Sequence, residues 1–191
     1  MSNVCSVKAG TEIKALDLVY ISIGAALIAV CSWISIPTAV PFTLQTFAVF
    51  FVLLLLGGER GTIATLIYVL LGAVGLPVFA GFKGGVGILF GNTGGYILGF
   101  LFIGLIYTLF MRLPKKTMLI KVAALVLGLA VCYAFGTAWF MYVYMRNSGD
   151  VGLITVLGWC VFPFIIPDLI KMALAVVIAK RIEPAIKTGP I

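Results

Sequence analysis

An aspartate and a lysine interrupt an otherwise apolar segment near the end of the chain, FIIPDLIKMALAVV. Asp168 and Lys171 stand three residues apart, so on a helix they share one face. A charge at the centre of a membrane helix costs about 2.5–3.5 kcal/mol to insert, and such charges mark functional sites by default. Asp168 follows Pro167, which predicts a helix start whose dipole favours an anion. The pair is a candidate ligand-binding couple, and the alternative is a helix cap beside a snorkelling lysine.

A second candidate is the sequence NTGGY, which begins at Asn92. The asparagine amide offers both a donor and an acceptor, which suits an amide-like or urea-like group. The glycines that follow permit close approach of the backbone to a ligand, and Tyr96 adds a flat ring with a polar tip. The alternative is a helix start that packs through its glycines. Gln45, in PFTLQTF, is a weaker candidate because it can equally bond a neighbouring helix.

Two alanines in the first apolar run, Ala25 and Ala29, stand four residues apart beside Gly24. Small residues at this spacing give a flat helix face that another helix can approach closely. That helix can belong to another protein or to the same chain, and residue spacing does not distinguish the two.

The elements that carry these residues are predicted by composition and by the length of the apolar runs. Of 191 residues, 63% are hydrophobic and 10% are charged, against about 25% charged in soluble domains. Such a chain needs lipid as its solvent, and its long, non-alternating apolar runs favour helices over a barrel. We therefore expect an all-α membrane protein. Its six predicted transmembrane helices cover residues 17–36, 41–56, 62–76, 92–111, 118–144 and about 168–181.

The connections between these helices are expected to be irregular where proline and glycine gather. Pro37 and Pro41 bracket a short extended segment, residues 57–61 form a tight turn, and residues 77–96 are too rich in glycine for a straight helix. Irregular backbone at membrane depth is tolerated where it is buried or lines a cavity. Residues 153–166 are apolar but interrupted by proline.

The basic residues predict the orientation of the helices. Six spans place both chain ends on one side, with the turn at 57–61 and the connection at 112–121. That side holds ten basic residues, Lys8, Lys14, Arg60, Arg112, Lys115, Lys116, Lys121, Lys180, Arg181 and Lys187, and the other holds Lys83 and Arg146. The positive-inside rule then makes both termini cytoplasmic and the proline- and glycine-rich loops external, where they line a pocket. We expect one integral membrane domain over 1–191, with tails at 1–16 and 184–191 and a six-helix bundle at 17–183, in a bacterial plasma membrane.

Several functional classes are disfavoured. The chain has no histidine and its four cysteines are far apart, which argues against zinc or haem, and no cofactor is expected. The net charge is +7, but the basic residues lie between apolar runs, so they indicate membrane topology and not a nucleic-acid-binding surface. There is no Walker A, GxSxG or HExxH sequence, so neither ATP hydrolysis by a P-loop nor a familiar hydrolase is predicted.

The chain resembles the BioY family, the biotin-specific S components of energy-coupling factor (ECF) transporters. The resemblance runs from the first apolar run to Ile182. It is carried by IPTAVPFTLQTFAV (37–50), LLGAVGLPVFAGFKGGVGILFGNTGGYILGF (70–100) and PDLIKMALA (167–175). Family members commonly have proline where this chain has Asn92, so that residue is a point of difference.

The resemblance implies a biotin pocket near the external face, and partners that comprise a transmembrane coupling protein and two ATPase subunits. Asp168 and Asn92 would accept hydrogen bonds from the ureido group, and Lys171 or Asn92 would donate to it. Phe79, Phe82 and Tyr96 would cover the rings. Lys171 can instead hold the valerate carboxylate, and that choice stays open. Ala25 and Ala29 match the small-residue motif with which S components dock on the coupling protein.

Three other functions remain possible on the sequence alone. The chain can be an S component for another vitamin, such as thiamin or riboflavin. It can be an intramembrane enzyme that uses Asp168 and Lys171 as acid and base. A channel or scaffold built on small-residue contacts is the third alternative, and it predicts no tightly bound small molecule.

Overall fold

The computed structural model describes residues 15–38, 40–114 and 117–187, and for residues 183–187 only the backbone. Nearly all of the predicted N-terminal tail lies outside this range, with Cys5, Lys8 and Lys14, and so do Lys115 and Lys116. Of the predicted C-terminal tail, residues 184–187 still belong to the last helix, and residues 188–191 lie outside the described range.

The described chain is almost entirely helical. In chain order its elements are α1 (Ala15–Trp33), β1 (Ser35–Ile36), β2 (Phe42–Thr43), α2 (Gln45–Leu56), α3 (Gly58–Val74), α4 (Val86–Leu89), α5 (Gly94–Phe110), α6 (Met118–Ser148), α7 (Leu153–Cys160) and α8 (Phe162–Lys187). The two short strands pair antiparallel, Ser35 with Thr43 and Ile36 with Phe42. This pairing closes the proline-bracketed connection, which the sequence predicted only as extended.

Five of the six predicted helices correspond to α1, α2, α3, α5 and α6 to within a few residues. Two details of the prediction are wrong. The turn expected over 57–61 is confined to Gly57, whose φ is 85°, and α3 begins at Gly58. The last helix begins at Phe162 and not at Asp168, so Pro163 lies in its first turn and Pro167 inside it. Proline is tolerated in the first turn because the backbone N–H there has no partner within the helix.

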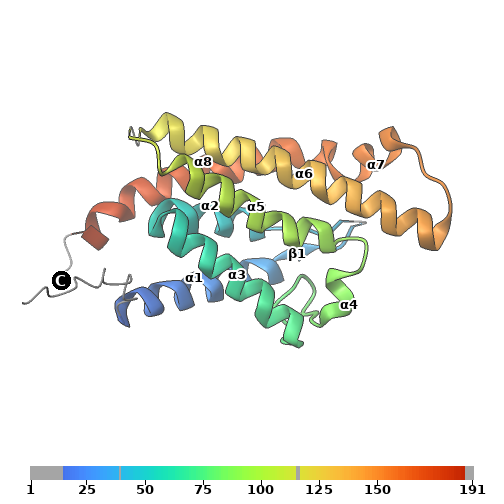
Figure 1. The fold of residues 1–191 in the computed structure, drawn as a ribbon, viewed down its shortest axis with the longest axis horizontal. Coiled ribbons are helices and arrows are strands. Elements are labelled where there is room, and N and C mark those ends of the chain that lie inside the picture. The colour runs from blue at the N-terminus through green and yellow to red at the C-terminus, as the bar shows by residue number, and fades with distance from the viewer. Residues whose placement is uncertain (1–14, 39, 115–116, 188–191) are drawn as a thin grey trace, which may run out of the picture.

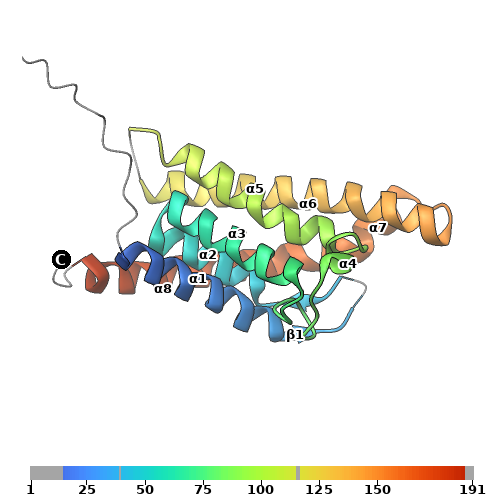
Figure 2. The ribbon, with the colours of Figure 1, turned by 60° about the horizontal axis from the view of Figure 1, so that its bottom comes forward.

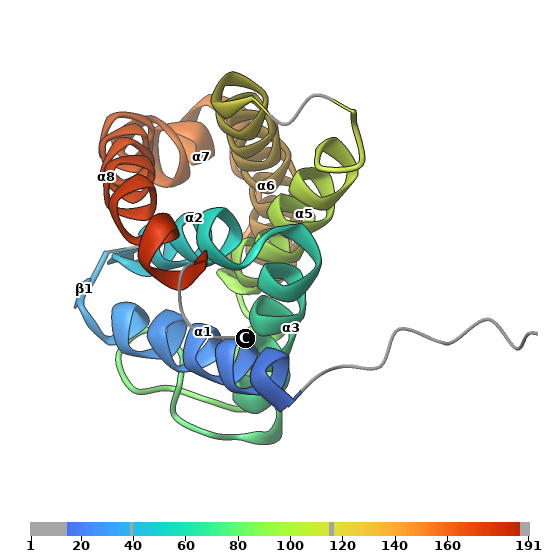
Figure 3. The ribbon, with the colours of Figure 1, turned by 90° about the vertical axis from the view of Figure 1, so that its left-hand side faces the viewer.

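Helix α2 lies at the centre of the bundle. Seen from one end, it is surrounded by α1, α3, α5 and α8, while α6 packs along α5 on the outside (Figure 3). Its side chains include some of the most deeply buried in the molecule, among them Ala48, Val49, Phe50 and Leu53. A residue at the start of α2 is therefore placed to meet side chains from several other helices.

The connections gather at two ends of the molecule. The start of α1, the α2–α3 turn, the α5–α6 connection and the end of α8 lie at one end (Figure 1). The strand β1, helix α4 and the connection from α6 to α7 lie at the other end, and Figure 2 shows the same division. At the first end, Arg60 forms an ion pair with Asp17 at 2.9 Å, which ties α3 to α1. This division is the one expected from the basic residues.

The apolar helices are those of a multi-pass membrane protein. Among the described residues, three helical segments have both the length and the apolarity needed to cross a bilayer: Ala15–Trp33, Met118–Ser148 and Leu153–Ile182, which joins α7 to α8. Helices α2 and α5 are apolar but shorter. A helix rises about 1.5 Å per residue and a bilayer core is about 30 Å thick, so the shorter helices fall short of a full straight crossing.

The glycine-rich segment between α3 and α5 folds back on itself. Helix α3 ends at Gly75, which has a φ of 111°, and the backbone groups of Phe79 and Lys83 then pair with each other. A Cβ on Gly84 would lie 2.2 Å from the carbonyl oxygen of Leu76, so only glycine allows this close return of the chain. The segment thus caps the end of the bundle at which α5 begins.

Candidate functional site

Asp168 and Lys171 are buried inside the bundle. Only 2% of Asp168 and 5% of Lys171 is exposed, and Lys171 Nζ lies 2.9 Å from Asp168 Oδ1. Because α8 begins at Phe162, Asp168 lies well inside the helix, and the predicted stabilisation by a helix start is wrong for this residue. Its charge is compensated by side chains.

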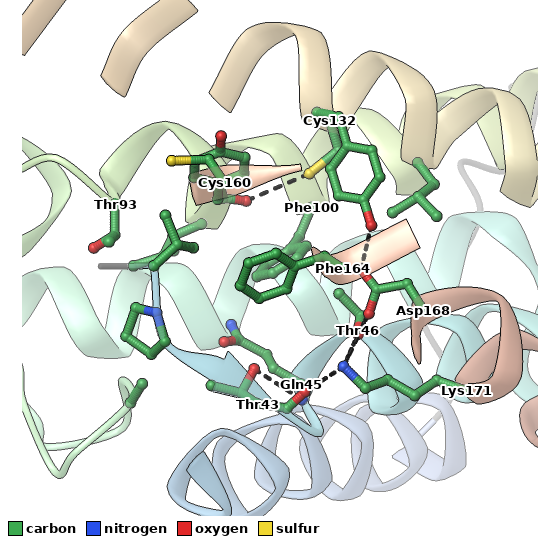
Figure 4. A pocket seen from close by; sticks show the side chains of 17 residues that line it. Thr43, Gln45, Thr46, Thr93, Phe100, Cys132, Cys160, Phe164, Asp168 and Lys171 are labelled. Atoms are coloured by element: carbon green, nitrogen blue, oxygen red, sulfur yellow. Dashed lines mark hydrogen bonds and ion pairs between the residues drawn. The ribbon is translucent and has the colours of Figure 1, made fainter. Parts of the chain in front are cut away.

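Three other elements supply those compensating contacts. The hydroxyl of Thr46, on α2, donates to Asp168 Oδ1 at 2.8 Å, and the hydroxyl of Tyr133, on α6, donates to Asp168 Oδ2 at 2.6 Å. Lys171 Nζ donates to the backbone oxygen of Thr43 at 2.6 Å and to Thr46 Oγ1 at 3.2 Å. Figure 4 shows the labelled Asp168, Thr46, Thr43 and Lys171 joined at one side of the pocket. The pair therefore connects α2, α6, α8 and the strand β2.

The two charges differ in their remaining capacity to bind a ligand. The ammonium of Lys171 has three N–H donors, and all three are directed at protein oxygens. It also lies 4.2 Å from the centroid of the Phe42 ring. The carboxylate of Asp168 accepts three hydrogen bonds, two at Oδ1 and one at Oδ2, although a carboxylate can accept about four. A further acceptor position thus remains at Oδ2.

A cavity of about 80 Å³ adjoins this pair. It is formed by the hairpin, α2, α5, α6, the α7–α8 junction and α8, and its walls are mostly apolar. The lining residues are Val40, Pro41, Thr43, Gln45, Thr46, Ala80, Thr93, Tyr96, Ile97, Phe100, Leu129, Cys132, Tyr133, Cys160, Phe164, Asp168 and Lys171. In Figure 4, Thr93 and Cys160 lie on the side opposite Asp168 and Lys171. The cavity is thus an apolar chamber with an ionic wall.

Four of the predicted site residues line this cavity: Gln45, Tyr96, Asp168 and Lys171. The amide nitrogen of Gln45 donates to the hydroxyl of Tyr68 at 2.9 Å, which holds the side chain in place. The hydroxyl of Tyr96 lies 3.1 Å from Thr137 Oγ1, so its ring is fixed at the wall. The structure therefore brings together residues that are separated by more than a hundred positions in the chain.

The other three, Asn92, Phe79 and Phe82, are not among the residues that line the cavity. Phe79 is 1% exposed and its ring meets that of Tyr68 edge-on, with centroids 5.6 Å apart. Phe82 is 64% exposed and stacks on Trp33 at 5.0 Å. Both rings therefore pack within the cap of the bundle and not in the wall of this cavity, and their contact with a ligand stays a prediction.

The structure adds four residues of the site that the sequence did not mark as candidates: Phe42, Tyr133, Cys132 and Cys160. Phe42 faces Lys171, and the other three lie in the cavity wall. Tyr133 stands four residues before Thr137 in the long apolar helix α6. Two hydroxyl side chains on one face of an apolar helix indicate that this face meets other polar groups, so the sequence did contain a signal for a site on α6.

The predicted docking face on α1 lies inside the molecule. Ala25 is 3% exposed and Ala29 is 8% exposed, and both belong to the hydrophobic core. Helix α1 packs there against α2 and α3. This is the intramolecular packing that residue spacing left open, and docking of a partner at these two alanines stays a prediction.

The chain matches a known protein family over almost its whole length. The model of the BioY family matches residues 6–188. The biotin transporter BioY of Thermotoga maritima is 43% identical over 170 residues, which cover 87% of this chain and 95% of that protein. The biotin transporter BioY2 of Lactococcus lactis subsp. cremoris is 35% identical over 165 residues, which cover 86% of this chain and 88% of that protein.

A solved structure has the same fold. The S-component for biotin from an ECF-type ABC transporter superposes with a TM-score of 0.78 at 28% sequence identity, and the match covers 92% of this chain and 94% of that one. The likeness spans almost all of both chains.

Proposed function

The chain belongs to the BioY family, and from that premise we propose that it is the biotin-binding S component of an ECF-type transporter. One observation carries the assignment to a site: the buried pair Asp168 and Lys171 faces an apolar cavity at the end of the bundle that holds the proline- and glycine-rich connections. An S component captures its substrate and does not convert it, so the protein is a transport subunit and not an enzyme.

The chemistry of biotin fits the charged wall of the cavity. Its fused ureido–thiophane head presents two N–H donors and one oxygen acceptor on a compact apolar frame. Asp168 Oδ2 has a remaining acceptor position, and a bond from an N–H to a carboxylate in a dry site is charge-assisted. Asp168 thus binds the ureido N–H.

Lys171 acts in this proposal through Asp168. All three of its N–H groups already point at Thr43, Thr46 and Asp168, so it holds the carboxylate in one orientation. To donate to biotin it has to release one of these bonds, and the longest, to Thr46 at 3.2 Å, costs least. This assignment makes Lys171 a positioning residue and leaves the valerate carboxylate to other donors.

The apolar walls suit the rest of the molecule. The side chains of Tyr96, Phe100 and Phe164 lie in the cavity wall and can pack on the bicyclic head. Small-molecule sites are typically lined by apolar and aromatic side chains with a few placed polar groups, and this cavity has that composition.

The same proposal covers topology. Helices α1, α2, α3, α5, α6 and α8 form the six spans, with the adjoining connections completing the crossing at the shorter α2 and α5, and the cavity opens toward the exterior. Among the described basic residues, the end that holds the start of α1 has those of the start of α3, the α5–α6 connection with the start of α6, and the last part of α8, which are Arg60, Arg112, Lys121, Lys180 and Arg181. The connection from α3 to α4 has Lys83, and the end of α6 has Arg146. By the positive-inside rule the first end is cytoplasmic, and the whole chain forms one integral domain of a bacterial plasma membrane. Family resemblance adds a transmembrane coupling protein and two ATPase subunits as partners.

Ligand identification tests the proposal. The protein is purified in detergent from cells grown with biotin, thiamin and riboflavin, and the small molecules that copurify are analysed by mass spectrometry. We expect unmodified biotin in a one-to-one ratio. Thiamin or riboflavin in its place, a chemically altered product, or no small molecule at all would each contradict the assignment.

A further inference from the structure

A second hollow, of about 330 Å³, lies next to Tyr133. It is a groove between α6 and the α7–α8 junction, and Tyr133 is the one residue that also lines the cavity beside Asp168. The site described above makes no use of this groove.

The α6 side of the groove has the geometry of a channel parallel to the helix axis. Tyr133, Thr137 and Met141 follow one another at four-residue spacing, so they form one stripe on α6, and Ala134 and Ala138 form the adjacent stripe. From Tyr133 to Met141 the helix rises about 12 Å. The two alanines provide the depth of the groove because their side chains are small.

The groove offers nothing to a polar occupant. Its lining has two hydroxyl groups, and both are engaged elsewhere: Tyr133 donates to Asp168 Oδ2, and Thr137 lies 3.1 Å from the hydroxyl of Tyr96. Water in such a space lacks partners, and apolar cavities without polar partners stay dry. A vitamin head group would lose its hydrogen bonds there.

The walls of the groove are continuous with surface that faces lipid. Met118–Ser148 and Leu153–Ile182 are both long enough to cross a bilayer, and most of each is not buried by the rest of the chain. Ala134, Ala138 and Leu153 are exposed. On the α6 side the recess is only as deep as the two alanines make it, which suits a single hydrocarbon chain better than a whole helix of about 10–12 Å across. A single hydrocarbon chain runs along the same direction as a membrane helix and meets these limits.

We propose that this groove binds an acyl chain of a membrane lipid. The chain lies along Thr137 and Met141 and ends against the ring of Tyr133, whose hydroxyl holds Asp168. In this arrangement the lipid chain packs against the side of the Tyr133 ring that lines the groove. A lipid held there stays with the protein when the rest of the bilayer is removed.

Native mass spectrometry tests this. The full chain is reconstituted in nanodiscs of equal parts phosphatidylethanolamine and phosphatidylglycerol and then released into detergent. We expect the wild type to retain one lipid and Ala138→Trp, which fills the groove, to retain none. Ala123→Trp is the matched control, because Ala123 is exposed on α6 and lies outside the groove, and it should retain the lipid.

Equal lipid retention in Ala138→Trp and in the wild type would overturn the proposal. A wild-type dimer that Ala138→Trp converts to a monomer without any change in bound lipid would overturn it too, because it would assign the groove to a second copy. Ala134→Leu narrows the groove with less bulk and decides the question if the tryptophan variant does not fold. Biotin titration of each variant verifies that the fold is retained.

Discussion

The hydroxyl of Tyr133 donates to one oxygen of the Asp168 carboxylate at 2.6 Å, while Lys171 and Thr46 bind the other oxygen. The two side chains come from α6 and α8, which the short helix α7 separates in the chain. Tyr133 thus holds Oδ2 of the carboxylate while Lys171 holds Oδ1, and together they fix the orientation of the group. The orientation of the proposed ureido acceptor depends on a residue that carries no charge.

Tyr133→Phe removes this bond without changing the ring. We expect the free energy of unfolding to fall by about 1–3 kcal/mol, because a buried carboxylate oxygen loses its partner. Chemical denaturation in detergent measures the change. The control is Tyr142→Phe, since Tyr142 is 61% exposed on the same helix. Equal stability of Tyr133→Phe and the wild type would show that the hydroxyl is not needed to hold Asp168.

Lys171→Met leaves Asp168 buried without its cation. Removal of one member of a buried ion pair costs about 3–5 kcal/mol, so this variant should be among the least stable. The double variant Asp168→Asn with Lys171→Met removes both charges and should regain part of that loss. The pairwise coupling is obtained from unfolding of the two single variants and the double variant. Strict additivity would indicate that the two charges do not stabilise each other in the folded protein.

Gly136→Ala should disturb the cavity through Tyr96. A Cβ at position 136 would lie 2.3 Å from Cδ1 of the Tyr96 ring, so the ring has to move toward the cavity. We expect a loss of about 1–3 kcal/mol in stability from overpacking, together with weaker biotin binding. Gly158→Ala is the control, because nothing lies within 4 Å of a Cβ at that position. Unchanged biotin affinity in Gly136→Ala would place the ring of Tyr96 outside the binding site.

Much of the fold is predictable because lipid imposes a simple rule on the chain. Each long apolar run has to satisfy its own backbone hydrogen bonds, so the runs that become α1, α5 and α6 can be located to within a few residues. The error at α8 arises from Pro163 and Pro167, which predict breaks in a soluble protein. In this membrane protein the helix continues through both residues.

The site residues whose positions depend on tertiary packing were harder to predict than the two charged ones. Asp168 and Lys171 stand out because charge is rare in apolar segments. Phe79 and Phe82 are close in sequence to the glycine-rich cap, but the direction of each ring is set by Tyr68 and Trp33, which the sequence does not bring together. The face of α1 that carries Ala25 was ambiguous for the same reason, because small residues suit packing inside a chain as well as between chains.

Biotin titration of Asp168→Asn by isothermal calorimetry is the most direct test of the central claim, that the buried carboxylate accepts a hydrogen bond from the vitamin. The amide keeps the shape of the side chain but removes the charge, so binding should weaken by about 1.5–3 kcal/mol, the range for hydrogen bonds to charged groups. Asp17→Asn is the matched control, since Asp17 pairs with Arg60 at the other end of the bundle, and it should bind as the wild type does. An Asp168→Asn protein that is folded and binds biotin with unchanged affinity would contradict the account.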